Sequence, residues 1–169
     1  IHYYLEMLKS LGFKTAGELP KLSIGENLRE ISQAILNRHH ITPQDTVVGM
    51  APGATFGPAK MWFPERFAAV GDRLVRDFSA KIILFGSKGD RGRAEKIKQY
   101  SNNRFVNLAG TTSLKEAIAL IASCRLFITN DSGLMHLAGA LWIPLVGIFG
   151  STNPATTSLA GENSIIVHH

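Results

Sequence analysis

The residues best able to do chemistry in this sequence stand together as Asn-Asp-Ser-Gly at 130–133, with His136 one helical turn later. An apolar, strand-like run precedes them and an apolar, helical run follows. The free amides and the positive dipole end of a helix start bind phosphate groups. We therefore expect Ser132 and Gly133 to face a phosphate. Asp131 is placed to accept hydrogen bonds from a ribose, and His136 shares a helix face with Ser132.

A purely structural role remains open for the same residues, since Asp131 could cap the helix and His136 could be a packing residue. Ligand binding is favoured by four further loops, each of which follows a predicted strand and is rich in Gly, Ser, Thr or Asn. These loops are residues 52–60, 86–90, 109–113 and 150–154. Ligands of open parallel sheets bind beyond the carboxyl ends of the strands, so we expect the loops to converge there.

The elements that must position these loops alternate along the chain. Short apolar runs rich in β-branched residues predict strands at 46–51, 81–86, 105–110, 125–129, 144–149 and 164–169. Amphipathic runs predict helices at 1–13, 25–39, 64–78, 90–101, 113–123 and 132–141. Ser113 and Glu116 have the spacing of a capping box at one helix start. This alternation predicts an α/β fold with a Rossmann-like, doubly wound parallel sheet covered on both faces.

Composition narrows the class of protein. The 169 residues suit one domain, and 45% hydrophobic against 18% charged residues is typical of a folded core. A single cysteine, Cys124, excludes an internal disulfide framework and multi-cysteine metal sites, and we expect it to be a core residue. The net charge of +5 favours a polyanionic partner. The densest basic stretch, 88–98, lacks the interleaved aromatic residues of single-strand nucleic-acid binders.

Several phosphate and catalytic motifs are excluded by their spacing. The glycines at 86–92 do not form the G-x-G-x-x-G dinucleotide fingerprint, and the loop 52–60 is not a P-loop. Ser132 lacks the G-x-S-x-G setting of a serine hydrolase. The six histidines show no metal-ligand spacing, so no metal site is predicted.

With these residues placed, the sequence resembles the C-terminal half of the heptosyltransferases of glycosyltransferase family 9, over residues 47–157. The segments that carry the resemblance are 52–62, 84–87, 107–122, 129–141 and 144–154. The combination of PGATFGPAK at 52–60 with NDSGLMH at 130–136 is the most specific part. The resemblance implies a GT-B architecture, in which two Rossmann-like domains enclose the active site.

The resemblance also implies a division of labour along the chain. Residues 1–40 would be an interdomain helix and linker region, and residues 41–169 a nucleotide-sugar-binding domain, with the N-terminal acceptor domain absent from this chain. The implied enzyme is a glycosyltransferase that moves L-glycero-D-manno-heptose from ADP-heptose to the inner core of lipopolysaccharide. The reaction inverts the anomeric centre and needs no metal or cofactor. The catalytic base is expected in the missing domain, so the fragment alone is expected to be inactive.

The family motifs imply roles for particular residues. Lys60 would stabilise the negative charge of the leaving diphosphate. The other implied substrate-binding residues are Thr55, Ser87, Asp90, Asp131, Ser132, Gly133 and His136. Implied partners are the ADP-heptose donor, the lipopolysaccharide acceptor and an anionic inner-membrane surface, without nucleic acid. These partners imply a cytoplasmic protein that is peripheral to the inner membrane.

Three other functions compete with this interpretation. One is a stand-alone module that binds a nucleotide sugar without catalysis. Another is a different GT-B enzyme, such as a sugar-nucleotide epimerase. The third is a dehydrogenase-like domain that binds NAD, which the missing glycine fingerprint disfavours.

Overall fold

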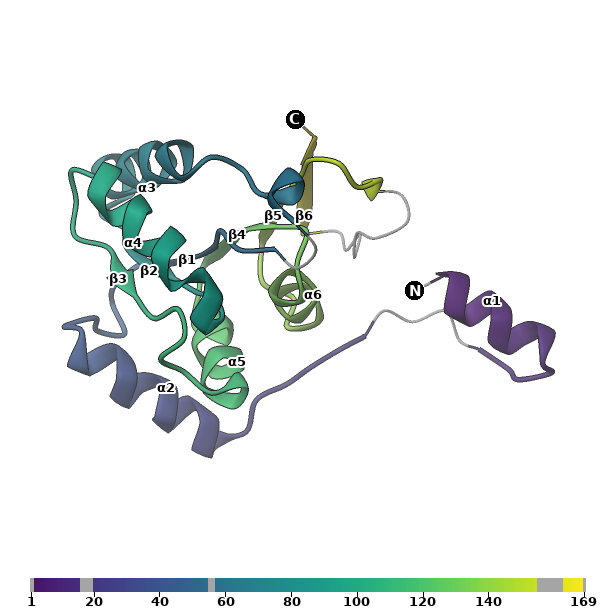
Figure 1. The fold of residues 1–169 in the computed structure, drawn as a ribbon. Helices are drawn as coiled ribbons and strands as arrows, with labels where there is room; N and C mark the ends of the chain where they lie inside the picture. The colour runs from purple at the N-terminus through teal and green to yellow at the C-terminus, as the bar shows by residue number, and fades with distance from the viewer. Residues whose placement is uncertain (1, 16–19, 55–56, 155–162, 169) are drawn as a thin grey trace.

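The computed structural model describes residues 2–15, 20–54, 57–154 and 163–168. Six strands form one sheet (Figure 1). They are β1 (Val47–Ala51), β2 (Lys81–Leu84), β3 (Val106–Asn107), β4 (Leu126–Asn130), β5 (Leu145–Phe149) and β6 (Ser164–His168). The helices are α1 (His2–Ser10), α2 (Glu26–Arg38), α3 (Pro64–Phe78), α4 (Arg91–Tyr100), α5 (Leu114–Ala122) and α6 (Gly133–Ala140). Two short 3₁₀ turns are η1 (Pro58–Lys60) and η2 (Lys88–Asp90).

The strand order is β3-β2-β1-β4-β5-β6, and every neighbouring pair is parallel. The chain adds strands on one side of β1 and then crosses to the other side at β4. Open α/β sheets bind ligands at this switch, beyond the carboxyl ends of the strands. In Figure 1, α3 and α4 cover one face of the sheet, and α2 and α5 lie on the other.

Alternate side chains of the strands enter two separate cores, as the pleat of a β-sheet requires. Phe85 and Phe127 lie in the core beneath α2, α5 and α6, with ring centroids 5.5 Å apart. Met50 and Ile82 lie in the core beneath α3 and α4. Because both faces are buried, the central strands have continuous apolar sequences rather than alternating ones.

The predicted α/β fold is confirmed, and each predicted helix and strand is present with small shifts at its ends. The third strand differs most. It was predicted over 105–110, but it pairs only at Val106 and Asn107, opposite the last two residues of β2. Cys124 is buried in the core, as expected. Within the described part of the chain, every helix falls short of the length and apolar character that a membrane span requires.

Asp72 joins α3 to the turn that follows α4. Its carboxylate accepts hydrogen bonds from the Ser101 hydroxyl, from the N–H of Asn102 at 3.0 Å and from the side-chain amide of Asn103 at 2.9 Å. Partial desolvation alone would raise the pKa of Asp72, but these hydrogen bonds together hold it below its usual value of 3.8. The ionised carboxylate therefore stabilises the folded state.

We expect Asp72→Asn to lower the free energy of unfolding by about 1–2 kcal/mol at neutral pH, because the amide loses charge-assisted hydrogen bonds. A depressed folded-state pKa stabilises the protein above the unfolded value of 3.8, and this contribution is lost as the pH falls through the folded value. Urea unfolding of the wild type and of Asp72→Asn across a pH series measures the difference between their free energies of unfolding. This difference should become smaller in acid. If it stayed constant at every pH, the proposed role of the Asp72 carboxylate would be contradicted.

Candidate functional site

A cavity of about 550 Å³ lies at the carboxyl ends of β1, β2 and β4, next to the switch in strand order. Four of the predicted loops meet there, as expected from the sequence. They contribute Gly53 and Ala54, then Gly86, Ser87 and Asp90, then Thr112 and Ser113, and lastly Ser132 and Gly133. The convergence follows from the parallel sheet, which delivers each strand end to the same edge.

Three helical segments begin around the cavity, and two of them are closed by their own side chains. At η2 the Asp90 carboxylate accepts hydrogen bonds from the N–H and the hydroxyl of Ser87, at 2.8 and 2.7 Å. At α5 the predicted capping box is present, with the Ser113 N–H donating to Glu116 at 2.7 Å and the Glu116 N–H donating back at 3.3 Å. A helix start satisfied in this way has fewer amides left for a ligand.

The start of α6 is different. Its N-cap residue, Ser132, makes no side-chain cap bond, and the hydroxyl lies 3.1 Å from that of Thr129 instead. Asp131 is not the N-cap residue, and its Oδ2 instead accepts hydrogen bonds from Lys60 and Thr152. Gly133 and Leu134, the first residues of this helix, line the cavity, and the Ser132 side chain leaves their amides uncapped. An uncapped helix start facing a cavity is suited to an anionic group such as phosphate.

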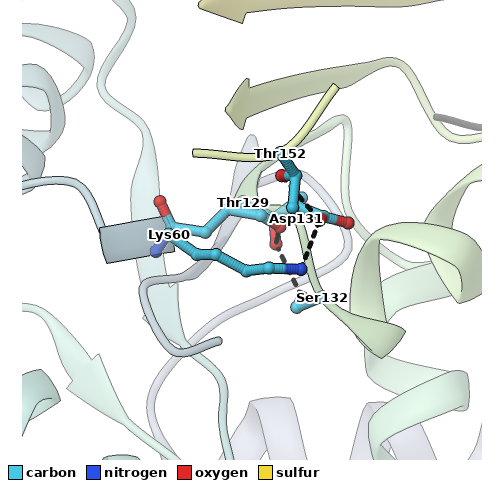
Figure 2. A network of polar contacts seen from close by, with 6 residues as sticks. Lys60, Thr129, Asp131, Ser132 and Thr152 are labelled. Atoms are coloured by element: carbon cyan, nitrogen blue, oxygen red, sulfur yellow. Dashed lines mark hydrogen bonds and ion pairs between the residues drawn. The ribbon is translucent and has the colours of Figure 1, made fainter. Parts of the chain in front are cut away.

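Lys60 and Asp131 form a largely buried ion pair beside the start of α6 (Figure 2). The Lys60 ammonium donates to Asp131 Oδ2 at 2.8 Å, and the Thr152 hydroxyl donates to the same oxygen at 2.9 Å. The side chain of Lys60 is 20% exposed and that of Asp131 6% exposed. Partial exposure leaves the ammonium accessible to a ligand, while the carboxylate holds it in place.

Asn130, the last residue of β4, is fully buried and holds both ends of the loop that carries Lys60. Its side-chain amide donates to the carbonyl oxygen of Pro52 at 2.7 Å, and its side-chain oxygen accepts from the N–H of Trp62 at 3.1 Å. Arg93 of α4 donates to the carbonyl oxygen of Trp62 at 3.3 Å and so holds the same residue from its other backbone group. Asn130 thereby connects the loop after β1 to the strand that leads into α6.

The rest of the cavity lining combines apolar and polar side chains. The apolar ones are Ala51, Phe85, Leu114, Ala117, Leu134 and Leu137. The Asp90 carboxylate is among the polar groups, and a Cβ at Gly53 would collide with it. An apolar wall suits the base of a nucleotide, a carboxylate suits the hydroxyls of its sugar, and free helix amides suit its phosphates.

The structure brings most of the predicted site residues into one region. Ser87, Asp90, Ser132 and Gly133 line the cavity, and Lys60 and Asp131 pair beside it. Thr55 lies outside the described residues.

His136 lies one turn into α6, on an exposed side that does not line the cavity. Desolvation lowers the pKa of His136 below its usual value, and the charge of Asp131 partly opposes this shift.

Sequence reasoning missed the residues whose roles depend on long-range packing. Thr152 stood in one of the glycine-rich loops, but nothing in its spacing pointed to Asp131. Phe85, Leu114, Leu134 and Leu137 were recognised only as members of strands and helices. Asn130 was noticed in the polar stretch, yet its two backbone partners come from residues 78 and 68 positions away.

Comparison with known proteins identifies the family that this chain matches. The family described as glycosyltransferase family 9 (heptosyltransferase) matches residues 3–169. Lipooligosaccharide heptosyltransferase 2 of Haemophilus ducreyi is 42% identical over 132 residues, which cover 75% of this chain and 38% of that protein.

Two solved structures have the same fold. The structure of E. coli ADP-heptose lps heptosyltransferase II superposes with a TM-score of 0.83 and 31% identity, over 94% of this chain and 48% of that one. A family 9 glycosyl transferase from Veillonella parvula superposes with a TM-score of 0.87 and 28% identity, over 99% and 48%. The chain therefore spans less than half the length of the relatives it matches. On the strength of the family match over nearly all of its residues, this chain belongs to glycosyltransferase family 9, the heptosyltransferases.

Proposed function

We propose that this chain is the nucleotide-sugar-binding half of a heptosyltransferase that uses ADP-heptose. The observation that carries the proposal is the cavity at the strand ends, where the uncapped start of α6 meets an apolar wall. The adenine would lie against Phe85 and Leu137, and the ribose hydroxyls would reach Asp90. The diphosphate would receive hydrogen bonds from the α6 amides and from Lys60.

The proposed reaction transfers L-glycero-D-manno-heptose to the inner core of lipopolysaccharide, as in heptosyltransferase II. A hydroxyl oxygen of the acceptor forms a bond to the anomeric carbon from the side opposite the diphosphate. The bond from that carbon to the phosphate oxygen breaks, and its electron pair leaves with ADP, so the anomeric centre is inverted. The hydroxyl proton would pass to a base in the proposed acceptor domain, outside this chain.

The contribution of this chain to the reaction would be electrostatic. Negative charge accumulates on the phosphate oxygen as the bond to the sugar lengthens, and Lys60 and the α6 amides are held where they can stabilise it. The Asp131 carboxylate, which is itself held by the Thr152 hydroxyl, would orient the ammonium before the donor arrives. Thr55 and His136 remain proposed donor contacts on the strength of the family motifs.

The longer protein is proposed to have two domains. Residues 41–169 would form the donor domain of a two-domain GT-B enzyme, and residues 1–40 would lead to it from the acceptor domain. Within that leading segment, α2 rests on the donor domain through buried Leu36 and a Ser32–Ser123 hydroxyl contact of 2.8 Å. Because the acceptor is carried on a lipid, the enzyme would work in the cytoplasm at the inner-membrane surface.

Calorimetric titration of the chain with ADP, ADP-heptose, UDP and NAD tests the proposal. We expect the two adenosine diphosphate ligands to bind and UDP to bind more weakly. Tighter binding of UDP would reject the ADP-sugar donor and leave a different nucleotide sugar, as used by some epimerases. Binding of NAD alone would favour the dehydrogenase-like alternative. A heptose-transfer assay of the full-length enzyme separates a catalyst from a stand-alone binding module. We expect transfer by the wild type and none by its Asp131→Asn or Lys60→Met variants.

Gly53 offers a test of how the ribose side of the cavity is shaped. We expect Gly53→Ala to weaken ADP binding by about tenfold, because overpacking costs about 1–3 kcal/mol and the new methyl group would push the Asp90 carboxylate aside. Calorimetry of the variant with ADP measures the change. The matched control is Gly92→Ala, whose Cβ would meet no atom within 4 Å. Equal ADP affinities for the two variants would contradict the proposed contact between Asp90 and the ribose.

A further inference from the structure

A second hollow, of about 1040 Å³, runs along the β3 edge of the sheet and shares no lining residue with the candidate donor cavity. Its walls come from the end of α2, the start of β2, the outer side of α4 and β3. We call it the basic edge groove and define it by its charged lining residues. These are Arg38, Lys81, Arg91, Glu95, Lys98 and Arg104. Five cations against one carboxylate give the groove a formal charge of +4, most of the chain's net +5.

The positive charge of this groove is only partly neutralised. Lys98 pairs with Glu95 at 3.2 Å, and Lys81 lies 3.8 Å from Asp45 outside the groove. The remaining three cations, which are all exposed, form no ion pair within the described part of the chain. They are Arg38, Arg91 and Arg104. Glu95 attracts Arg91 and Glu116 attracts Arg38 from beyond ion-pair distance, but the groove keeps an excess of positive charge that an anionic partner would relieve.

Two exposed aromatic side chains accompany the groove at one end. Because α3 and α4 both return the chain against the direction of the strands, both helices end at the amino edge of the sheet. Phe78, the last residue of α3, is 67% exposed and stands three residues before Lys81. Tyr100, the last residue of α4, is 58% exposed and stands two residues after Lys98. Aromatic residues beside lysine and arginine are typical of surfaces that rest on a membrane interface.

A membrane explains these features better than a nucleic acid does. Among the groove's lining residues no exposed Phe, Tyr or Trp ring is available for bases to stack on, since Phe105 is buried in the core and the exposed rings are the imidazoles of His39 and His40. The aromatic residues instead stand at its rim, where they could enter the headgroup region of a bilayer. Lysines and arginines gain attraction to anionic headgroups within a Debye length of the surface.

We propose that the basic edge groove, with Phe78 and Tyr100 at its rim, is a contact surface for the anionic phospholipid headgroups of a membrane. The surface would hold the protein beside a lipid-carried acceptor, and in that respect the inference rests on the proposed function. It makes no use of the donor cavity, so the two can fail independently.

Sedimentation of the chain with lipid vesicles tests the inference. The wild type should bind vesicles of phosphatidylglycerol mixed equally with phosphatidylcholine, should not bind vesicles of phosphatidylcholine alone, and should be released by salt. Substituting Arg38, Arg91 and Arg104 together with alanine should lower the partition coefficient by at least about tenfold, since each cation near an anionic surface contributes to binding.

The matched control removes three cations elsewhere on the surface, with the same change in net charge. These are Lys9, Arg29 and Arg73, each of which already pairs with a carboxylate. We expect the control to bind within about threefold of the wild type, because paired surface charges contribute little. A second variant, Phe78→Ser with Tyr100→Ser, should also bind vesicles less well while keeping its salt dependence.

Equal losses of vesicle binding in the two triple variants would overturn the proposed membrane surface. Vesicle binding that does not depend on anionic lipid would overturn it as well. Unchanged vesicle binding by the groove variant, together with loss of binding to a single-stranded oligonucleotide, would make the groove a nucleic-acid surface instead. ADP titration of the groove variant should match the wild type. If no protein bound ADP but vesicle binding still required the groove, the proposed function would fail and the membrane surface would stand.

Discussion

Replacing Lys60 with alanine is expected to weaken ADP binding by about 10- to 100-fold, the effect of losing one hydrogen bond to a charged group. Lys60 is the cation held beside the uncapped start of α6, and its partner Asp131 is almost fully buried. Without the ammonium, an uncompensated carboxylate would stand next to the diphosphate and repel it. Calorimetric titration with ADP at neutral pH and moderate salt measures the loss.

Two further variants separate the charge of Lys60 from the shape of its side chain. Lys60→Met keeps most of the volume and should lose nearly as much affinity as Lys60→Ala. The double variant Lys60→Ala with Asp131→Asn removes the repelling carboxylate and should regain part of the loss. Lys96→Ala removes an exposed cation from α4, away from the cavity, and should leave ADP affinity unchanged. If Lys60→Met bound ADP like the wild type, the proposed diphosphate contact would be wrong.

Replacing Asn130 with alanine is expected to lower the free energy of unfolding by about 2–4 kcal/mol, because it leaves a buried donor and a buried acceptor without partners. The N–H of Trp62 and the carbonyl of Pro52 both depend on this side chain, which has no exposed surface. Urea unfolding at neutral pH measures the loss. ADP affinity should fall as well, since the loop between Pro52 and Trp62 carries Lys60.

The control for Asn130 is Asn37→Ala on α2. Asn37 is exposed and its side-chain oxygen accepts a hydrogen bond from Gln33 one turn away, at 2.8 Å, so the loss of this side chain should change stability by less than about 0.5 kcal/mol. Asn130→Asp keeps the acceptor for Trp62 but can no longer donate to Pro52, and it should be destabilised as well. If Asn130→Ala unfolded at the same urea concentration as the Asn37 variant, the loop would have to be held by other contacts.

The sequence by itself determined the order of the elements and the place of the binding loops. Strands buried on both faces leave continuous apolar runs, and helices leave a 3.6-residue pattern, so both are visible to local reasoning. The Ser113–Glu116 capping box was predictable for the same reason, because its partners are three residues apart. Once the strands were taken as parallel, the convergence of Gly53, Ser87 and Ser132 at one edge followed.

Only the tertiary structure decided which groups meet across that edge. Lys60 and Asp131 are 71 positions apart, and they lie in the segments that follow β1 and β4, which are neighbours in the sheet. The sequence marked Asp131 as either a helix cap or a ligand contact. The structure excludes the cap, because packing delivers Lys60 and Thr152 to the carboxylate and so leaves the α6 amides free. Local patterns describe neighbours within a turn or a strand, whereas a binding site is made by segments that the fold brings together from far along the chain.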